Sequence, residues 1–225
     1  MHFRQSLFIK VFIDNWLLME LTSENRNSLI KKILGLLMDK GLKNLTMDLV
    51  ASELSMSKRT LYEIFGSKFD MIDQTLGYLF QKQRDKAENI FNSAPNTMVA
   101  LLEIFNQWNL MLCSLTLDFF HDIDTLYPEI GRRFYKKKEE DRKHWFPIYQ
   151  KGAEEGLFRQ DVNPKVILKM FEYQLEALKR MESQLNKEFT LEEIYRTISI
   201  SMLRSIATVH GLEVLEDYMK NKTVK

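Results

Sequence analysis

The residues best suited to chemistry in this chain lie close together, in the short stretch Ser57–Glu63. Within it, two cations, a hydroxyl and a phenol stand among apolar positions: Lys58, Arg59, Thr60 and Tyr62. Side chains of these types donate hydrogen bonds to phosphate oxygens and to base edges in the major groove of DNA. The stretch therefore predicts a nucleic-acid contact, provided that a helix presents these side chains on one exposed face.

The flanking residues predict such a helix and a second one before it. Thr46 is suited to cap the first helix, in which Val50 and Leu54 share one face because they are four residues apart. Ser57 is suited to cap the second helix. Its inward positions would be apolar: Leu61, Ile64 and Phe65. Two short helices with an exposed polar face on the second form a helix-turn-helix.

Apolar spacing alone also fits an αα-hairpin inside a helical bundle, so the residue types must decide. The segment resembles the TetR family of bacterial repressors at seven positions: Thr46, Ala51, Leu61, Tyr62, Phe65, Ser67 and Lys68. It departs from the family at Ser55, where the family usually has glycine and where serine lacks glycine's freedom at positive φ. The resemblance implies a three-helix DNA-binding head followed by a helical regulatory domain.

Seven residues are the candidates for contact with DNA: Thr46, Ser57, Lys58, Arg59, Thr60, Tyr62 and Lys68. The overall charge does not indicate a nucleic-acid partner, since 32 Lys and Arg face 31 Asp and Glu. Between Thr22 and Lys68, eight cations face five anions, which is a modest positive balance. Lys68 opens a further helix, whose N-terminal N–H groups favour a phosphate.

Length and composition predict an all-α protein of four parts. Only four Pro and eight Gly occur in 225 residues, and Leu, Met, Lys and Glu are abundant. We expect an N-terminal extension at 1–21, a helix-turn-helix domain at 22–68 that ends its first helix at Gly41, a linking helix at 69–93, and a helical regulatory and dimerisation domain at 94–225. The boundary between the linking helix and the regulatory domain is placed at the Ser93–Asn96 stretch, because it contains Pro95.

Apolar periodicity predicts four long helices in the regulatory domain, at about Thr97–Phe120, Arg132–Glu155, Pro164–Leu185 and Leu191–His210. We expect Pro147 to kink the second, and His121, Asp122 and Asp124 to end the first. The last two helices are apolar on more than one face, which favours burial against another chain. The resemblance likewise implies a homodimer through these two helices, with a palindromic double-stranded DNA operator as partner.

Six bulky residues of this domain are candidates for a ligand site: Trp108, Met111, Phe120, Trp145, Tyr149 and Phe171. Each also suits an ordinary core position. Together they could enclose a cavity for an apolar or amphipathic small molecule. The sequence does not identify the molecule.

No constellation of residues predicts catalysis. Phosphate loops, nucleophile elbows and metal motifs are absent from the sequence, so we expect no enzyme, cofactor or metal. His121 with Asp122 and Asp124 could ligate a metal, although a polar cluster at a helix end explains them more simply. Cys113, the single cysteine, excludes a disulfide within the chain and suits a small buried position.

The first eighteen residues are apolar but contain Arg4, Lys10 and Asp14, which excludes a membrane span and argues against a signal peptide. We expect either a start assigned too far upstream, with Met19 as the true one, or a short extra helix.

Taken with the family resemblance, the sequence predicts a cytoplasmic, DNA-binding regulator, a repressor released by a small molecule. The alternative is a helical interaction or scaffold protein that does not bind DNA.

Overall fold

The computed structural model describes residues 23–115, 119–141, 145–185 and 188–223. The expectations for residues 1–18 and for Met19 lie outside these ranges. In the described part, the chain is helical apart from loops and one isolated antiparallel bridge between Phe158 and Ala207, which confirms the all-α prediction. The chain divides into two compact units, residues 1–81 and 82–225. The division falls inside one helix, α5.

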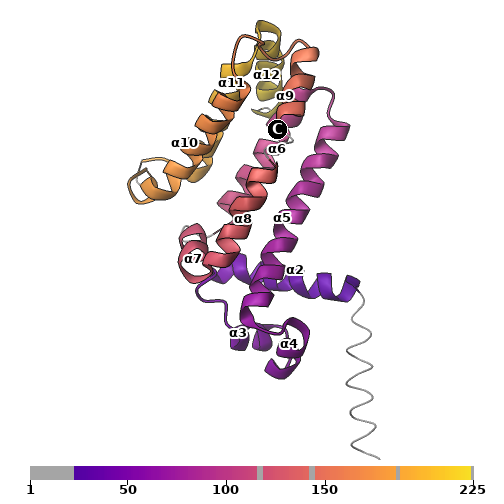
Figure 1. The fold of residues 1–225 in the computed structure, drawn as a ribbon, viewed down its shortest axis with the longest axis vertical. Coiled ribbons are helices and arrows are strands. Elements are labelled where there is room, and N and C mark those ends of the chain that lie inside the picture. Colours follow the sequence, from indigo (N-terminus) through magenta and orange to yellow (C-terminus); the bar gives the residue numbers. More distant parts are fainter. Residues whose placement is uncertain (1–22, 116–118, 142–144, 186–187, 224–225) are drawn as a thin grey trace, which may run out of the picture. The chain divides into compact units, whose positions relative to one another are not determined.

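In the part that the structure describes, the first unit holds four helices (Figure 1). These are α2 (Ser23–Lys40), α3 (Met47–Glu53), α4 (Lys58–Phe65) and the first part of α5 (Lys68–Ser93). Gly41 follows α2 with φ of 77°, and its N–H donates to the Leu37 carbonyl at 2.9 Å, so the predicted end of this helix is confirmed. The fully buried side chains come from all four helices and from the loop after α2: Ile33, Leu37, Leu42, Leu45, Val50, Leu61, Met71 and Ile72.

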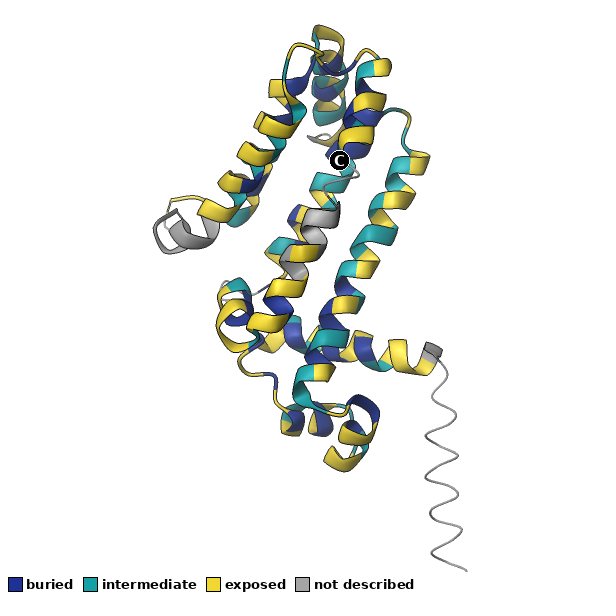
Figure 2. Ribbon diagram, in the orientation of Figure 1, coloured by how far each residue is buried: buried dark blue, intermediate teal, exposed yellow. Residues whose placement is uncertain are grey.

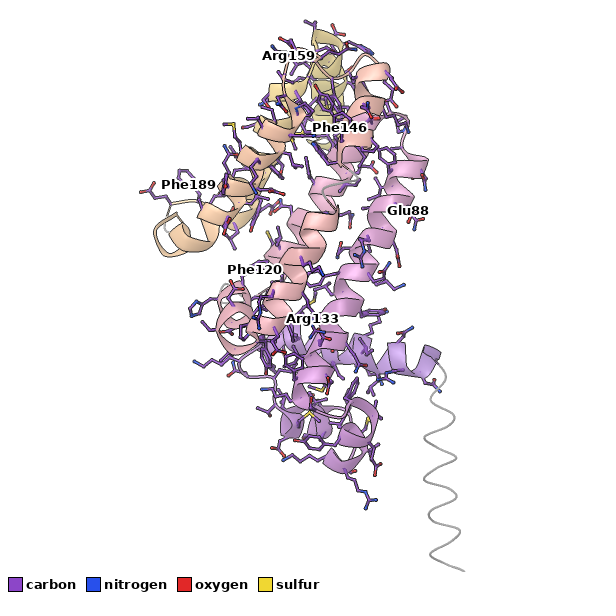
Figure 3. All side chains as sticks on the ribbon, in the orientation of Figure 1. Glu88, Phe120, Arg133, Phe146, Arg159 and Phe189 are labelled. Carbon is purple, nitrogen blue, oxygen red and sulfur yellow. The ribbon has the colours of Figure 1, made fainter. Side chains whose placement is uncertain are left out.

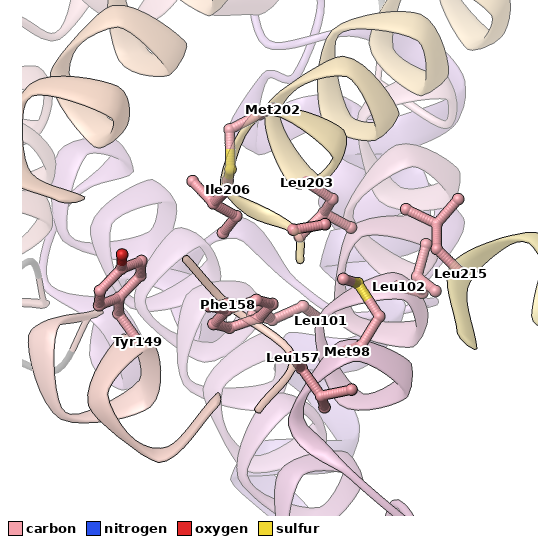
Figure 4. Close-up of a cluster of buried hydrophobic side chains, with 11 residues drawn as sticks. Met98, Leu101, Leu102, Tyr149, Leu157, Phe158, Met202, Leu203, Ile206 and Leu215 are labelled. Atoms are coloured by element: carbon pink, nitrogen blue, oxygen red, sulfur yellow. The ribbon is translucent and has the colours of Figure 1, made fainter. Parts of the chain in front are cut away.

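The second unit continues from the end of α5 through seven more helices in its described ranges. They are α6 (Thr97–Cys113), α7 (Phe119–Leu126), α8 (Pro128–Asp141), α9 (Trp145–Glu154), α10 (Pro164–Leu185), α11 (Leu191–Ile206) and α12 (Val209–Thr223). Asn96 caps α6 by accepting a hydrogen bond from Val99 N–H at 3.0 Å. The core of the unit gathers residues from α6, α9, the loop after α9, α11 and α12: Met98, Leu101, Leu102, Tyr149, Leu157, Phe158, Met202, Leu203, Ile206, Ala207 and Leu215 (Figure 4).

Three of the four helices predicted in this unit differ from the structure in their bounds. The first ends at Cys113 rather than Phe120, because the Ser114 hydroxyl bonds the Met111 carbonyl at 2.6 Å and closes the last turn. His121, Asp122 and Asp124 do not end a helix; they lie inside α7. Asp122 stands in the first turn of α7, where a carboxylate suits the helix dipole.

The charged helix predicted at Arg132–Glu155 corresponds to α8 and α9. α8 begins earlier, at Pro128, since proline is favoured in the first position of a helix. Residues 142–144, between α8 and α9, lie outside the described ranges, and Pro147 is the third residue of α9. The kink expected at Pro147 therefore stays a prediction.

The helix predicted at Leu191–His210 ends at Ile206, and α12 was not predicted. The loop after α9 ends the helix here through two backbone hydrogen bonds. Arg159 N–H donates to the Ile206 carbonyl at 2.8 Å, and Thr208 N–H donates to the Leu157 carbonyl at 2.9 Å. Ala207 between them is extended, with φ of −75° and ψ of 144°. The Thr208 hydroxyl then accepts from Gly211 N–H at 3.0 Å and caps α12.

One face of α10 carries large apolar side chains that this chain leaves uncovered. Val166, Met170 and Tyr173 are 52%, 55% and 60% exposed, and their spacing of four and three residues places them in one stripe. Up to residue 177, exposed positions alternate with partly buried ones along this helix (Figure 2). By contrast, none of the exposed large apolar side chains in the described part of the chain lies on α11, whose exposed positions include Thr197, Ser201 and Arg204.

Candidate functional site

Local hydrogen bonds position α4 and the helix before it. The Thr46 hydroxyl accepts from Leu49 N–H at 3.1 Å and caps α3. The Ser57 hydroxyl accepts from Thr60 N–H at 3.0 Å and lies 2.8 Å from the Thr60 hydroxyl, which caps α4. Both predicted caps are confirmed, and the hydroxyls of Thr46, Ser57 and Thr60 are engaged within the helix starts.

The turn between α3 and α4 is tight. Met56 N–H donates to the Ala51 carbonyl at 2.9 Å, and Ser55 N–H donates to the Ser52 carbonyl at 3.2 Å. Ser55 adopts φ of 53° and is the one non-glycine residue with positive φ in the described ranges. Ser55 therefore adopts the left-handed backbone for which the family usually has glycine. Its Cβ atom adds a steric cost in this conformation.

The side chains of α4 divide sharply between two faces. Leu61, Ile64 and Phe65 are buried, as predicted, while Tyr62 is 46% exposed. Lys58 and Arg59 are also exposed, and each is paired with a carboxylate. Lys58 Nζ lies 2.6 Å from Asp48 Oδ1 of α3, and Arg59 Nε lies 2.8 Å from Glu63 Oε1.

The hydrogen bond to Asp48 raises the pKa of Lys58 above its ordinary value. Lys58 is therefore protonated at neutral pH. The exposed face of α4 offers two permanent cations and a phenol on a short stiff helix. That is the arrangement a recognition helix needs in the major groove.

Arg26 of α2 contacts the end of α4 and α5, a role that no pattern along the chain predicts. Its guanidinium donates to the Ile64 carbonyl at 3.3 Å and to Gln74 Oε1 of α5 at 2.6 Å. It also lies 5.8 Å from the centroid of the Phe65 ring. One side chain therefore ties α2 to the end of α4 and to α5. Only the fold brings these three partners together.

Lys68, the remaining DNA-contact candidate, is the first residue of α5 and is half-buried. Ser67 caps this helix by accepting from Asp70 N–H at 3.0 Å, and its hydroxyl donates to Asp70 Oδ2 at 2.5 Å. The predicted start of the linking helix is confirmed. Asp70 was not anticipated, and its carboxylate already satisfies the helix start in part.

Three of the six ligand candidates meet in the second unit. Tyr149 is part of the buried cluster of Figure 4, and Trp145 and Phe171 pack against that cluster. The Tyr149 hydroxyl donates to the Arg159 carbonyl, and burial raises the pKa of Tyr149. The Phe171 ring lies 5.4 Å from the Phe105 ring, centroid to centroid.

The other three candidates lie outside this cluster. Trp108 is 38% exposed on α6, whereas Met111 is buried. Phe120 lies on α7 (Figure 3), half-buried, with its ring centroid 5.3 Å from that of Phe119. A site lined by all six residues therefore stays a prediction.

Two polar features of the second unit were missed at the sequence level. Glu172 of α10 is 8% exposed, with Lys169 Nζ 3.6 Å from its carboxylate. The Trp145 Nε1 atom is buried and has no hydrogen-bond acceptor among the described residues. A ligand acceptor beside Trp145 would satisfy this N–H, so Trp145 is the strongest of the ligand candidates.

The histidine and aspartates of α7 do not form a metal site. Asp122 is buried while His121 and Asp124 are exposed. No group of three or more His, Cys, Asp or Glu side chains in the described ranges is placed to hold a metal ion. Cys113, expected to be buried, is exposed at the end of α6, where the helix stops seven residues earlier than predicted.

Comparison with known proteins identifies the helix-turn-helix. Residues 29–75 match the bacterial regulatory proteins of the tetR family, a range that covers most of α2, all of α3 and α4, and the start of α5. The chain therefore carries the DNA-binding region of the tetR family. It is thus a DNA-binding transcriptional regulator, and its fold class is the one the resemblance implied: a helix-turn-helix head followed by a helical domain.

Relatives extend the similarity beyond the head. The HTH-type transcriptional repressor KstR2 of Mycobacterium tuberculosis is 23% identical over 158 residues, which cover 64% of this chain and 74% of the relative. A transcriptional regulator from Cytophaga hutchinsonii shares the fold with a TM-score of 0.65 at 19% identity, covering 82% of this chain and 99% of that one.

A transcriptional regulator from Saccharomonospora viridis, solved in complex with choline, gives a TM-score of 0.64 at 17% identity, covering 83% and 100% of the two chains. Among the described helices of the present chain, none combines the length and the apolar character that crossing a membrane requires.

Proposed function

We propose that this tetR-family regulator is a repressor that places α4 in the major groove of a two-fold symmetric operator. Lys58, Arg59, Thr60 and Tyr62 would contact bases and phosphates, and Lys68 would contact a phosphate near the start of α5. The observation that carries the proposal is the two-sided α4: an apolar face buried against the head and a polar face that is exposed. Such a repressor acts in the cytoplasm, where the chromosome lies.

The proposal is tested with DNA from upstream of the protein's own gene. In fluorescence-anisotropy titrations, Arg59→Ala should weaken binding by about 1–3 kcal/mol if Arg59 contacts a guanine. Lys68→Ala should weaken binding to all sequences and reduce the slope of log affinity against log salt by roughly one. Arg132→Ala, which removes an exposed arginine of the second unit, is the matched control and should bind like the parent. Parental binding by both head variants would contradict the assignment.

We also propose that two chains pair through α10 and α11, so that two recognition helices reach two half-sites about one DNA turn apart. The uncovered stripe of Val166, Met170 and Tyr173 supports the contribution of α10, because exposed apolar stripes of this kind are normally covered by a partner. For α11, the support is the family alone, since its exposed positions are polar.

Sedimentation of paired variants tests the dimer. Tyr173→Glu places a charge in the stripe and should give monomers at micromolar concentration, with loss of operator binding. Gln174→Glu makes the neighbouring exposed residue equally acidic and should leave the dimer intact. A parent protein that sediments as a monomer would contradict the dimer and the palindromic operator together.

Finally, we propose that an apolar or amphipathic small molecule binds beside Trp145 and lowers the affinity for DNA. The buried Trp145 Nε1 atom supports a polar acceptor on such a ligand. The route to the head would be α9, which carries Trp145 and Tyr149: Lys151 of the same helix lies over the Phe91 ring of α5, 4.5 Å from its centroid. α5 in turn begins in the DNA-binding unit, so a ligand that shifts α9 acts on the helix that both units share.

The effector proposal is tested by screening small molecules for a change in tryptophan fluorescence. A true effector should lose its fluorescence signal in Trp145→Phe but keep it in Trp108→Phe. It should also bind less tightly to the DNA complex, by the same factor as it weakens DNA binding. A compound that shifts Trp145 fluorescence and leaves operator affinity unchanged would contradict the switch.

A further inference from the structure

On the exposed surface formed by α3 and α4, acidic side chains neutralise the basic ones. Each of the two cations that α4 presents is paired with an acid of the same surface: Lys58 with Asp48 at 2.6 Å, and Arg59 with Glu63 at 2.8 Å. All four side chains are solvent-exposed, between 37% and 88%. Glu63 stands on the recognition helix itself, one turn after Arg59.

These pairs do not serve mainly to stabilise the fold. An exposed ion pair contributes about 0.2–1 kcal/mol, and an i,i+4 helix pair about 0.3–0.5 kcal/mol. The helices already have their caps and their apolar core. The acids matter more for what the surface does when DNA approaches.

A carboxylate on a groove-facing surface acts differently on correct and incorrect DNA. It repels phosphates in every register, which lowers the sequence-independent part of the affinity. In the correct register, it accepts a hydrogen bond from the amino group of a cytosine, or keeps its arginine aimed at a guanine. Discrimination against wrong partners by a repulsive group is a general source of specificity.

Resting on the proposed function of α4, we infer that Asp48 and Glu63 are specificity-determining residues, which lower the affinity of the α3–α4 surface for DNA that lacks the operator sequence. The family match covers both positions but says nothing of these side chains. The acids explain why a head that must bind DNA carries only a modest positive balance.

The experiment compares Asp48→Asn and Glu63→Gln with the parent, on the fragment that the parent binds and on a scrambled fragment of equal length. Each variant should bind scrambled DNA roughly three- to tenfold more tightly, with a salt slope steeper by about one. Affinity for the operator should rise less or fall, so that the ratio of the two affinities drops. Unchanged melting temperatures establish that the variants fold.

Asp39→Asn is the matched control. Asp39 forms an ion pair of the same kind with Lys40 at the end of α2, 2.7 Å apart, so the variant makes the same change in net charge away from α4. The control should leave the ratio of affinities unchanged. If Glu63→Gln and Asp48→Asn also leave the ratio unchanged, the inference is overturned while DNA binding by α4 stands. If the parent itself does not distinguish the two fragments, the proposed function fails instead.

Discussion

Two turns of this protein join consecutive helices by different means. The turn between α3 and α4 is held by its own residues: Met56 bonds Ala51, and Ser57 caps the next helix. The turn between α11 and α12 is held by a distant segment, through bonds from Arg159 to Ile206 and from Thr208 to Leu157. The first was predicted from the sequence and the second was missed. Local chemistry is visible along the chain, whereas contact between distant segments is not.

The largest effect should come from filling the close contact at the second turn. An ideal Cβ atom on Gly211 would lie 2.1 Å from the Leu157 carbonyl oxygen, so Gly211→Ala forces backbone apart. We expect a loss of about 1–3 kcal/mol or more in the free energy of unfolding. Urea denaturation measures it.

Gly77→Ala is the control for that variant, because Gly77 lies within α5 and a Cβ atom there meets nothing within 4 Å. It should stabilise the protein by about 0.5–1 kcal/mol. A Gly211→Ala protein as stable as the parent would mean that close packing does not define the second turn.

Removing a local cap should cost less. Ser57→Ala leaves the first N–H groups of α4 without the hydroxyl that now accepts from Thr60 N–H. We expect a loss of about 1 kcal/mol in stability, with weaker operator binding because α4 frays at its recognition end. Ser57→Asp restores an acceptor and should recover the stability but not the affinity, since it adds a negative charge beside DNA. Full stability in Ser57→Ala would show that the first turn depends on more than its own residues.

A smaller effect, of opposite sign, is expected at Ser55. Its φ of 53° costs a residue with a Cβ atom about 1–2 kcal/mol, and glycine removes this cost while adding freedom to the unfolded chain. Ser55→Gly should therefore raise the free energy of unfolding by up to about 1 kcal/mol. Thermal melting shows the gain. A destabilised Ser55→Gly would indicate that the serine hydroxyl holds the turn.

The smallest effect is a pH dependence at the start of α11, where Thr190 and Glu193 form a capping box. Hydrogen bonds from the backbone and hydroxyl of Thr190 lower the pKa of Glu193 below its ordinary value. A carboxyl group whose pKa is lower in the folded state stabilises the protein at pH values above its unfolded-state pKa. This stabilisation is lost as the pH falls through the folded-state pKa. The parent should therefore melt higher than Glu193→Gln at neutral pH, and the difference should vanish in acid. A constant difference would assign the effect to packing.

These cases show how far the sequence determines the structure. The head was predicted from its helix caps, from Gly41 and from the apolar face of α4, because each of these features affects residues that are close to it in the sequence. The predicted continuous helix to His210 was wrong, because contacts with the distant loop after α9 end α11 at Ile206. Arg26 illustrates the limit: its three partners lie at positions 64, 65 and 74, and no spacing along the chain links them.

The central claim is that α4 recognises a specific DNA sequence through its exposed face. Selection of bound sites from a random pool tests it directly, with the parent and Arg59→Ala selected in parallel. The parent should enrich a two-fold symmetric site with half-sites about one turn apart, and Arg59→Ala should lose the preference at one symmetric pair of positions. Enrichment of the same site with undiminished preference by Arg59→Ala, or no enrichment by the parent, would contradict the account.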